Sequence, residues 1–138
     1  MLVVNADWVY GDFVRGDSEL RYLQGQDYWG TDFKDNKEVL KAMYKGEHFF
    51  QQNCLYKREM FLKVGGFDKD LRMAEDFDLA TRLLLAGFNP KYLPGPLYMH
   101  RNHGDNLSAK GKQDINSHMK IVEDLHLKYK EQLSELGI

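Results

Sequence analysis

Three acidic residues stand within four positions in the middle of the chain, at Glu75, Asp76 and Asp78. Apolar residues recur at helical spacing from Glu75 to Ala86, so we expect a helix with these carboxylates in its first turn. Neighbouring helical residues point about 100° apart, so Glu75 and Asp76 cannot face one ligand equally. An aspartate held at a helix N-terminus suits a general base that acts on a hydroxyl. Simple capping of the helix is the alternative interpretation.

Two histidines, His100 and His103, are three positions apart and are followed by Asp105. Imidazole and carboxylate groups bind divalent metals, so this segment predicts part of a metal site. On a strand, residues three apart point to opposite faces, so both histidines can bind one metal only if a turn falls between them. A polar loop that follows a strand is the alternative interpretation.

Aromatic residues make up 13% of the chain, enough for a well-anchored core or for a surface that contacts sugars. Tyr28, Trp29 and Phe33 gather in the irregular segment 25–35. The 19 basic and 21 acidic residues give a net charge of −2, so no bulk positive field exists to hold nucleic acid.

The single cysteine, Cys54, excludes an intrachain disulfide framework and zinc sites built from cysteine alone. Two segments, 68–70 and 76–78, match the Asp-x-Asp pattern, but neither follows an apolar strand, so we assign neither to nucleotide-sugar binding. No apolar run approaches the ~18 residues of a membrane span, and the N-terminus lacks the features of a signal peptide. We therefore expect the chain as it stands to be soluble.

The elements that position these residues follow from the pattern of apolar and turn-forming residues. We expect one domain over residues 1–138, with a C-terminal amphipathic region over 109–138. The pattern predicts strands over 7–14, 90–93 and 97–101, and an extended segment over 49–56. It predicts helices over 36–45 (capped by Asn36), 57–64, 75–86 and 113–136.

Four runs follow one another in a recognisable order: Lys57–Asp68 (KREMFLKVGGFD), Met73–Leu79 (MAEDFDL), Leu93–Leu97 (LPGPL) and Arg101–Ser108 (RNHGDNLS). Together they resemble the C-terminal, acceptor-side half of a family 2 glycosyltransferase with the GT-A fold. The opening Ala6–Asp12 is similar to the strand that follows the donor-binding half of such enzymes. The resemblance covers about residues 6–108.

The resemblance implies an α/β fold, a partial GT-A (nucleotide-diphospho-sugar transferase-like) arrangement with a small mixed sheet and flanking helices. It also implies that the N-terminal donor-binding half is missing from this chain, which alone should then be inactive. The implied reaction is inverting transfer of a sugar from a nucleotide-sugar donor to a carbohydrate or lipid-linked acceptor. It uses Mg or Mn held mainly by residues outside this chain. The implied setting is cell wall or polysaccharide biosynthesis, in the cytoplasm or at the inner face of the membrane.

The resemblance carries roles over to individual positions of this sequence. Asp76 matches the general base of the Glu-Asp motif, and Glu75 would help to form the acceptor pocket. His103 is the best match to a metal ligand that some members have, with His100 second. Arg101 would contact the donor diphosphate.

Two other classes of protein compete with this interpretation. We expect Trp29 and Tyr28 to bind the acceptor in an enzyme, but the same rings could serve a noncatalytic carbohydrate-binding or protein-interaction module. A glycoside hydrolase needs carboxyl groups ~5–9 Å apart across a sugar, which the adjacent Glu75 and Asp76 do not provide. Absence of a donor half would expose apolar surface, so we also expect a homodimer.

Overall fold

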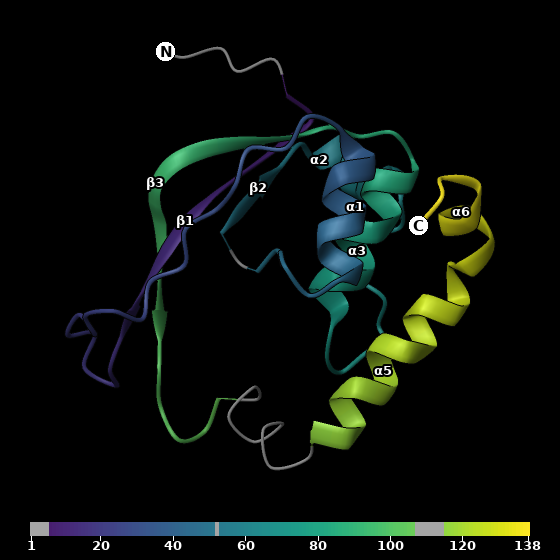
Figure 1. The fold of residues 1–138 in the computed structure, drawn as a ribbon. Helices are drawn as coiled ribbons and strands as arrows, with labels where there is room; N and C mark the ends of the chain where they lie inside the picture. The colour runs from purple at the N-terminus through teal and green to yellow at the C-terminus, as the bar shows by residue number, and fades with distance from the viewer. Residues whose placement is uncertain (1–5, 52, 107–114) are drawn as a thin grey trace.

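The structure of the protein, a computed structural model, describes residues 6–51, 53–106 and 115–138 (Figure 1). Its elements in chain order are β1 (Trp8–Gly16), α1 (Asn36–Tyr44), β2 (Cys54–Tyr56), α2 (Arg58–Lys63), α3 (Glu75–Leu85), β3 (Pro90–Arg101), α5 (Ile115–Lys128) and α6 (Lys130–Glu135). Strands and helices alternate along most of this order, which makes the fold α/β as predicted.

The described strands form one mixed sheet in the order β2-β1-β3. β1 is central: it pairs antiparallel with β2, with Trp8 opposite Tyr56, and parallel with β3. The parallel register runs from Trp8 opposite Pro90 to Gly16 opposite Arg101, and it shifts on both sides of Asp12. The prolines of β3 therefore lie on an edge strand, where a missing backbone donor is tolerated.

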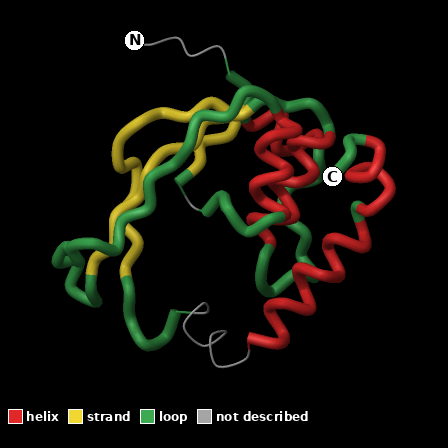
Figure 2. The backbone as a smooth tube through the Cα atoms, in the orientation of Figure 1, coloured by secondary structure: helices red, strands yellow, loops and turns green. Residues whose placement is uncertain are grey.

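The helices α1 and α3 pack together on one side of the sheet, and Figure 2 shows them as a pair beside the three strands. Between these layers Trp8 and Tyr10 of β1 contact Phe50, with ring centroids 4.6 and 5.0 Å apart respectively. Each of these three side chains is at most 2% exposed, so burial of large aromatic rings contributes strongly to the core.

β3 differs from the prediction of two short strands that flank a bend at residues 94–96. It is one strand of 12 residues, because the register shift at Asp12 absorbs the bend. The Asp12 carboxylate accepts a hydrogen bond of 2.8 Å from the Gly95 amide, which ties the bend to β1. Proline spacing alone cannot reveal a partner so distant along the chain.

Two helix boundaries also differ from the prediction. Asp35, not Asn36, caps α1, because its side chain accepts a hydrogen bond from the Glu38 amide. Asn36 instead donates to the carbonyls of Leu84 and Phe88, which fastens α1 to the end of α3.

The helix predicted over 113–136 is divided into α5 and α6 at Tyr129, whose backbone angles (φ −106°, ψ 10°) depart from the helical values. The hydroxyl of Tyr129 donates to Asp78 of α3, so a tertiary contact coincides with the break. The start of that prediction, at residues 113–114, lies outside the described residues. None of the described helices is both long and apolar enough to cross a membrane.

Candidate active site

Asp76 lies in the first turn of α3, where exposed backbone N–H groups and the helix dipole favour a negative charge. Its carboxylate accepts a hydrogen bond of 2.8 Å from the Phe77 amide, and the residue is half-buried. The helix has no side-chain cap: the cap position is held by Ala74 in the left-handed conformation (φ 59°). That conformation costs a non-glycine residue roughly 1–2 kcal/mol, so the entry to this helix is strained.

Two side chains of β2, Cys54 and Tyr56, lie close enough to the Asp76 carboxylate to feel its charge. Burial raises the pKa of the Cys54 thiol to about 12, and the negative charge of Asp76 adds to this effect. The pKa of Tyr56 is raised too, mainly by burial, with smaller contributions from Cys54 and Asp76. Both groups are therefore neutral at pH 7.

The other two acidic residues of this turn lie in different surroundings. Glu75 is exposed, whereas Asp78 is completely buried. The Asp78 carboxylate accepts hydrogen bonds from Lys128 (3.0 Å) and Tyr129 (2.6 Å), and it pairs with Arg82 (2.7 Å). Asp78 thus fixes α3 to the helices that follow it, which is a structural role.

Tyr28 and Trp29 point to different environments. Tyr28 pairs with Phe13 of β1, and the two rings are stacked with centroids 4.9 Å apart. Its hydroxyl lies 2.6 Å from Nδ1 of the buried His48. Trp29 is 62% exposed. Of these two predicted acceptor-binding residues, Trp29 therefore has the ring that solvent or a ligand can reach.

Tyr28 and β2 lie along the same edge of β1. Cys54 pairs with Tyr10, and Tyr28 forms a bridge to Phe13 three residues further along the strand. At 3.3 Å per residue, this places Tyr28 about 10 Å from Cys54 along the edge. The structure thus brings two groups of residues to one edge of the sheet. One is the aromatic pair Tyr28 and Trp29, and the other is Asp76 with Cys54 and Tyr56, called here the Asp76 cluster.

Arg101 and His103 lie elsewhere. Arg101 is exposed and pairs with Gly16, whereas Tyr56, beside Asp76, pairs with Trp8 at the other end of β1. Eight residues of strand separate these positions, or roughly 25 Å. The structure therefore does not bring the predicted diphosphate and metal contacts together with Asp76.

His103 is exposed, and its surroundings are those of a tight polar turn. Its amide donates to the Asn106 side chain (2.6 Å), and its Nδ1 accepts from the Asp105 amide (3.3 Å). Within the described ranges, no three metal-ligating side chains gather at one place. The described residues alone therefore do not fit a divalent metal, and we derive no chemical step through one.

Sequence reasoning missed two buried polar residues near this edge. Asp12 is 2% exposed, and His48 is also 2% exposed. Burial lowers the pKa of His48 to about 4, so its imidazole is neutral at pH 7. Its Nε2 has no hydrogen-bond partner among the described residues. The one signal in the sequence was the acidic residue Asp12 in the middle of a strand rich in aromatic and β-branched residues.

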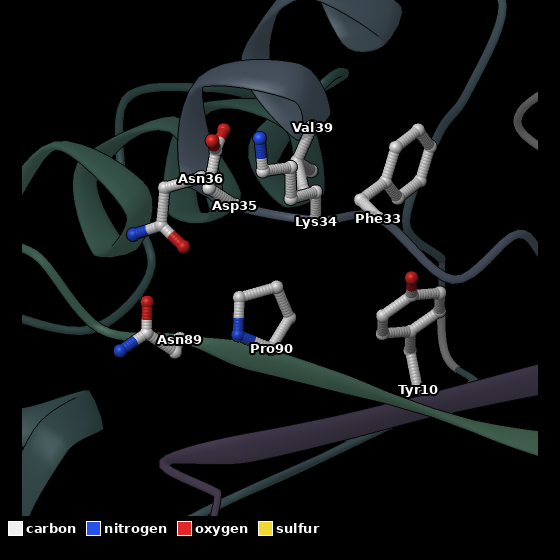
Figure 3. Close-up of a pocket in the computed structure, with 8 residues that line it drawn as sticks. All are labelled: Tyr10, Phe33, Lys34, Asp35, Asn36, Val39, Asn89 and Pro90. Atoms are coloured by element: carbon white, nitrogen blue, oxygen red, sulfur yellow. The ribbon is translucent and has the colours of Figure 1, made fainter.

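A small cavity of about 120 Å³ lies at the start of α1, above the first residue of β3 (Figure 3). In the close-up, Asn36 and Asn89 stand at one end of it, and the rings of Tyr10 and Phe33 stand at the other. None of the predicted site residues lines this cavity, so it is separate from the Asp76 cluster.

The comparison with protein families gives one finding, and it covers most of the chain. Residues 8–127 match the family described as "Glycosyltransferase like family 2". No curated protein matches the chain.

Proposed function

Because the chain belongs to glycosyltransferase-like family 2, we propose that it carries the acceptor side of an inverting sugar transfer. In this proposal a nucleotide sugar is the donor, and a carbohydrate or lipid-linked molecule supplies the acceptor hydroxyl. The setting is cell wall or polysaccharide synthesis at the cytoplasmic side of a membrane. The family match supports glycosyl transfer, and the place of Asp76 in the first turn of α3 supports its role as the base.

The surroundings of Asp76 carry the proposal. A general base must be charged before the reaction and must accept a proton during it. The first turn of α3 favours the charge, and the adjoining groups of β2, Cys54 and Tyr56, are held neutral.

The proposed step balances as a single displacement. The acceptor O–H bond breaks and its proton passes to the Asp76 carboxylate. The acceptor oxygen forms a bond to the anomeric carbon of the donor sugar. The bond from that carbon to the diphosphate oxygen breaks, and the nucleoside diphosphate leaves with the electron pair. Attack opposite the leaving group inverts the anomeric configuration.

The test replaces Asp76 in the full natural chain that contains these residues. Asp76→Asn keeps the shape of the side chain but cannot accept the proton. We expect kcat to fall at least about a hundredfold, with donor binding nearly unchanged. Release of nucleoside diphosphate from a panel of nucleotide sugars, with carbohydrate acceptors present, measures the effect.

Two further variants separate the possible outcomes. Glu131→Gln, at an exposed carboxylate in the first turn of α6, is the matched control and should leave kcat unchanged. If Glu75→Gln abolished turnover while Asp76→Asn retained it, the base would be the neighbouring residue. If both variants retained turnover, the proposed function of this helix would be wrong.

A further inference from the structure

Asp12 is a buried carboxylate in the middle of the sheet, and three groups from two segments of the chain, β3 and the segment around Gly30, donate hydrogen bonds to it. The donors are the Tyr92 hydroxyl (2.6 Å), the Gly95 amide (2.8 Å) and the Gly30 amide (2.7 Å). Burial raises the pKa of Asp12, but these three hydrogen bonds outweigh burial, so the pKa is lowered. An ionised group with such partners is fixed in place, and it fixes the groups that donate to it.

The donor at Gly30 is next to the exposed Trp29. A side chain at Gly30 would place its Cβ 2.6 Å from the Tyr92 ring, so this backbone lies directly against β3. On the other side of Trp29, Tyr28 exchanges two backbone hydrogen bonds with Phe13 (2.8 and 3.1 Å). Both neighbours of Trp29 are therefore anchored to the sheet.

The residue after Gly30 is anchored as well, because the carbonyl of Thr31 accepts a hydrogen bond from the buried Tyr10 hydroxyl. Residues 28–31 are thus held at three places, and the Trp29 side chain is the large apolar group among them that faces solvent. A backbone held in this way loses little further freedom when a ligand binds to the indole that it carries, which favours binding.

We propose that Trp29 stacks on a pyranose ring of the acceptor and that Asp12 is the positioning residue that presents it. The inference rests on the proposed function, and it names the acceptor as a carbohydrate with an apolar ring face. An indole supplies a large flat apolar surface, which suits the C–H face of a sugar ring. Tyr28 lies about 10 Å from Cys54 along the sheet edge, so a short oligosaccharide could span from Trp29 to Asp76.

The two tryptophans of the chain allow a direct test by NMR, because Trp8 is buried and Trp29 is exposed. In a ¹⁵N-labelled sample their indole N–H signals are separate, and Trp29→Phe assigns them. We expect cellobiose or chitobiose to shift the Trp29 signal and to leave the Trp8 signal in place. Sorbitol, which has hydroxyl groups but no ring, should shift neither.

Variants then test the positioning role. Trp29→Ala should weaken disaccharide binding about tenfold or more, and Trp29→Tyr should restore part of it. Asp12→Asn should weaken binding at least about fivefold. Tyr22→Ala, at a ring that is 52% exposed in the same region, is the matched control and should change nothing.

Asp12→Asn could also unfold the chain, which the Trp8 signal would report. Gly30→Ala covers that case, because it displaces the segment from Tyr92 and leaves Asp12 intact. It should weaken binding to a similar extent. The proposal is overturned if neither disaccharide moves the Trp29 signal, if sorbitol moves it equally, or if folded Asp12→Asn and Gly30→Ala bind like the wild type.

The same titration separates this inference from the proposed function. Asp76→Asn should leave the shift of the Trp29 signal unchanged, because it alters the proposed base and not the indole that binds the sugar. If turnover depends on Asp76 but no disaccharide shifts the Trp29 signal, only the proposed sugar binding by Trp29 is wrong. If the disaccharides shift the Trp29 signal but Asp76→Asn retains turnover, only the proposed transfer mechanism is wrong.

Discussion

The two sides of α3 have opposite chemistry. Toward α5 and α6, the buried Asp78 carboxylate is surrounded by donors from Arg82, Lys128 and Tyr129. Asp76, by contrast, lies within electrostatic range of a thiol and a phenol of β2 that burial keeps neutral. Residues two apart on a helix point about 200° from each other, so the helix itself separates the two carboxylates. The difference teaches that position on the helix, and not residue type, decides which aspartate is buried among charged partners.

The largest expected effect comes from the same substitution on each side of this helix. Asp78→Asn should lower the free energy of unfolding by about 3–5 kcal/mol, because it removes a fully buried charge that pairs with the half-buried Arg82 and leaves Lys128 with Asp68 alone. Asp76→Asn should lower it less, by about 1 kcal/mol, since the half-buried Asp76 loses a charge at a helix N-terminus but keeps its shape. Urea denaturation of both variants measures the contrast. Equal losses would mean that both carboxylates are structural.

His48 is another group that burial keeps neutral at pH 7, and it gives a prediction for acid pH. The folded chain keeps His48 neutral down to a pH of about 4, whereas the unfolded chain protonates it near 6.5. Stability should therefore fall as the pH drops from about 6.5 to 4, by about 2–3 kcal/mol. Denaturation of the wild type and His48→Gln across this range isolates the contribution, because the glutamine does not titrate. A difference between them that stays constant with pH would contradict the prediction.

A smaller effect separates charged from neutral hydrogen bonds among the helices. Tyr129→Phe removes the hydroxyl that donates to the Asp78 carboxylate and should cost about 1.5–3 kcal/mol. Tyr44→Phe removes a longer bond of 3.3 Å between two neutral hydroxyls, to Thr81, and should cost about 0.5–1 kcal/mol. The order of the two losses, measured by thermal unfolding, is the decisive quantity. A reversed order would show that Asp78 is not the centre of this contact.

The smallest effect concerns how the helices begin. α1 has a side-chain cap, Asp35, whereas α3 begins at Ala74 without one. Asp35→Ala should therefore lower the free energy of unfolding by about 1 kcal/mol. Lys37→Ala, at an exposed position in the same turn, is the control and should leave stability within about 0.5 kcal/mol of the wild type. Loss of equal size in both variants would argue against capping by Asp35.

The sequence predicted the elements that depend on local pattern. The helix from Glu75 was predicted to within one residue at its end, because its apolar stripe and the following Gly87 are local signals. The strand predicted over 7–14 appears as Trp8–Gly16. The cap of α1 was misplaced by one residue, since Asp35 and Asn36 are both good capping residues and only the tertiary contacts of Asn36 distinguish them.

The features that the sequence did not predict depend on contacts between distant segments. Asp12 and Tyr92 are 80 residues apart, and no local pattern indicates that they meet. Likewise, the hydroxyl of Tyr129 meets Asp78 from 51 residues away. Within the candidate site, the helical position of Asp76 was predicted, but its neutral neighbours on β2 were not. The distance between Arg101 and Asp76 follows from the parallel register of β3, which only the structure reveals.

The pairing of β1 with β3 also determines when the sheet can form during synthesis of the protein. Asp7 and Asn89, which are hydrogen-bonded at the start of this pair, lie 82 residues apart. At ~5–20 residues per second, a ribosome needs roughly 4 to 16 seconds to make the intervening chain. During that interval β1 has no parallel partner, and its large aromatic residues are accessible to chaperones or to other nascent chains. Protease resistance of nascent chains should therefore appear only after β3 has emerged, and mutations that slow its pairing should lower the yield of soluble protein before they affect the activity of the folded molecules.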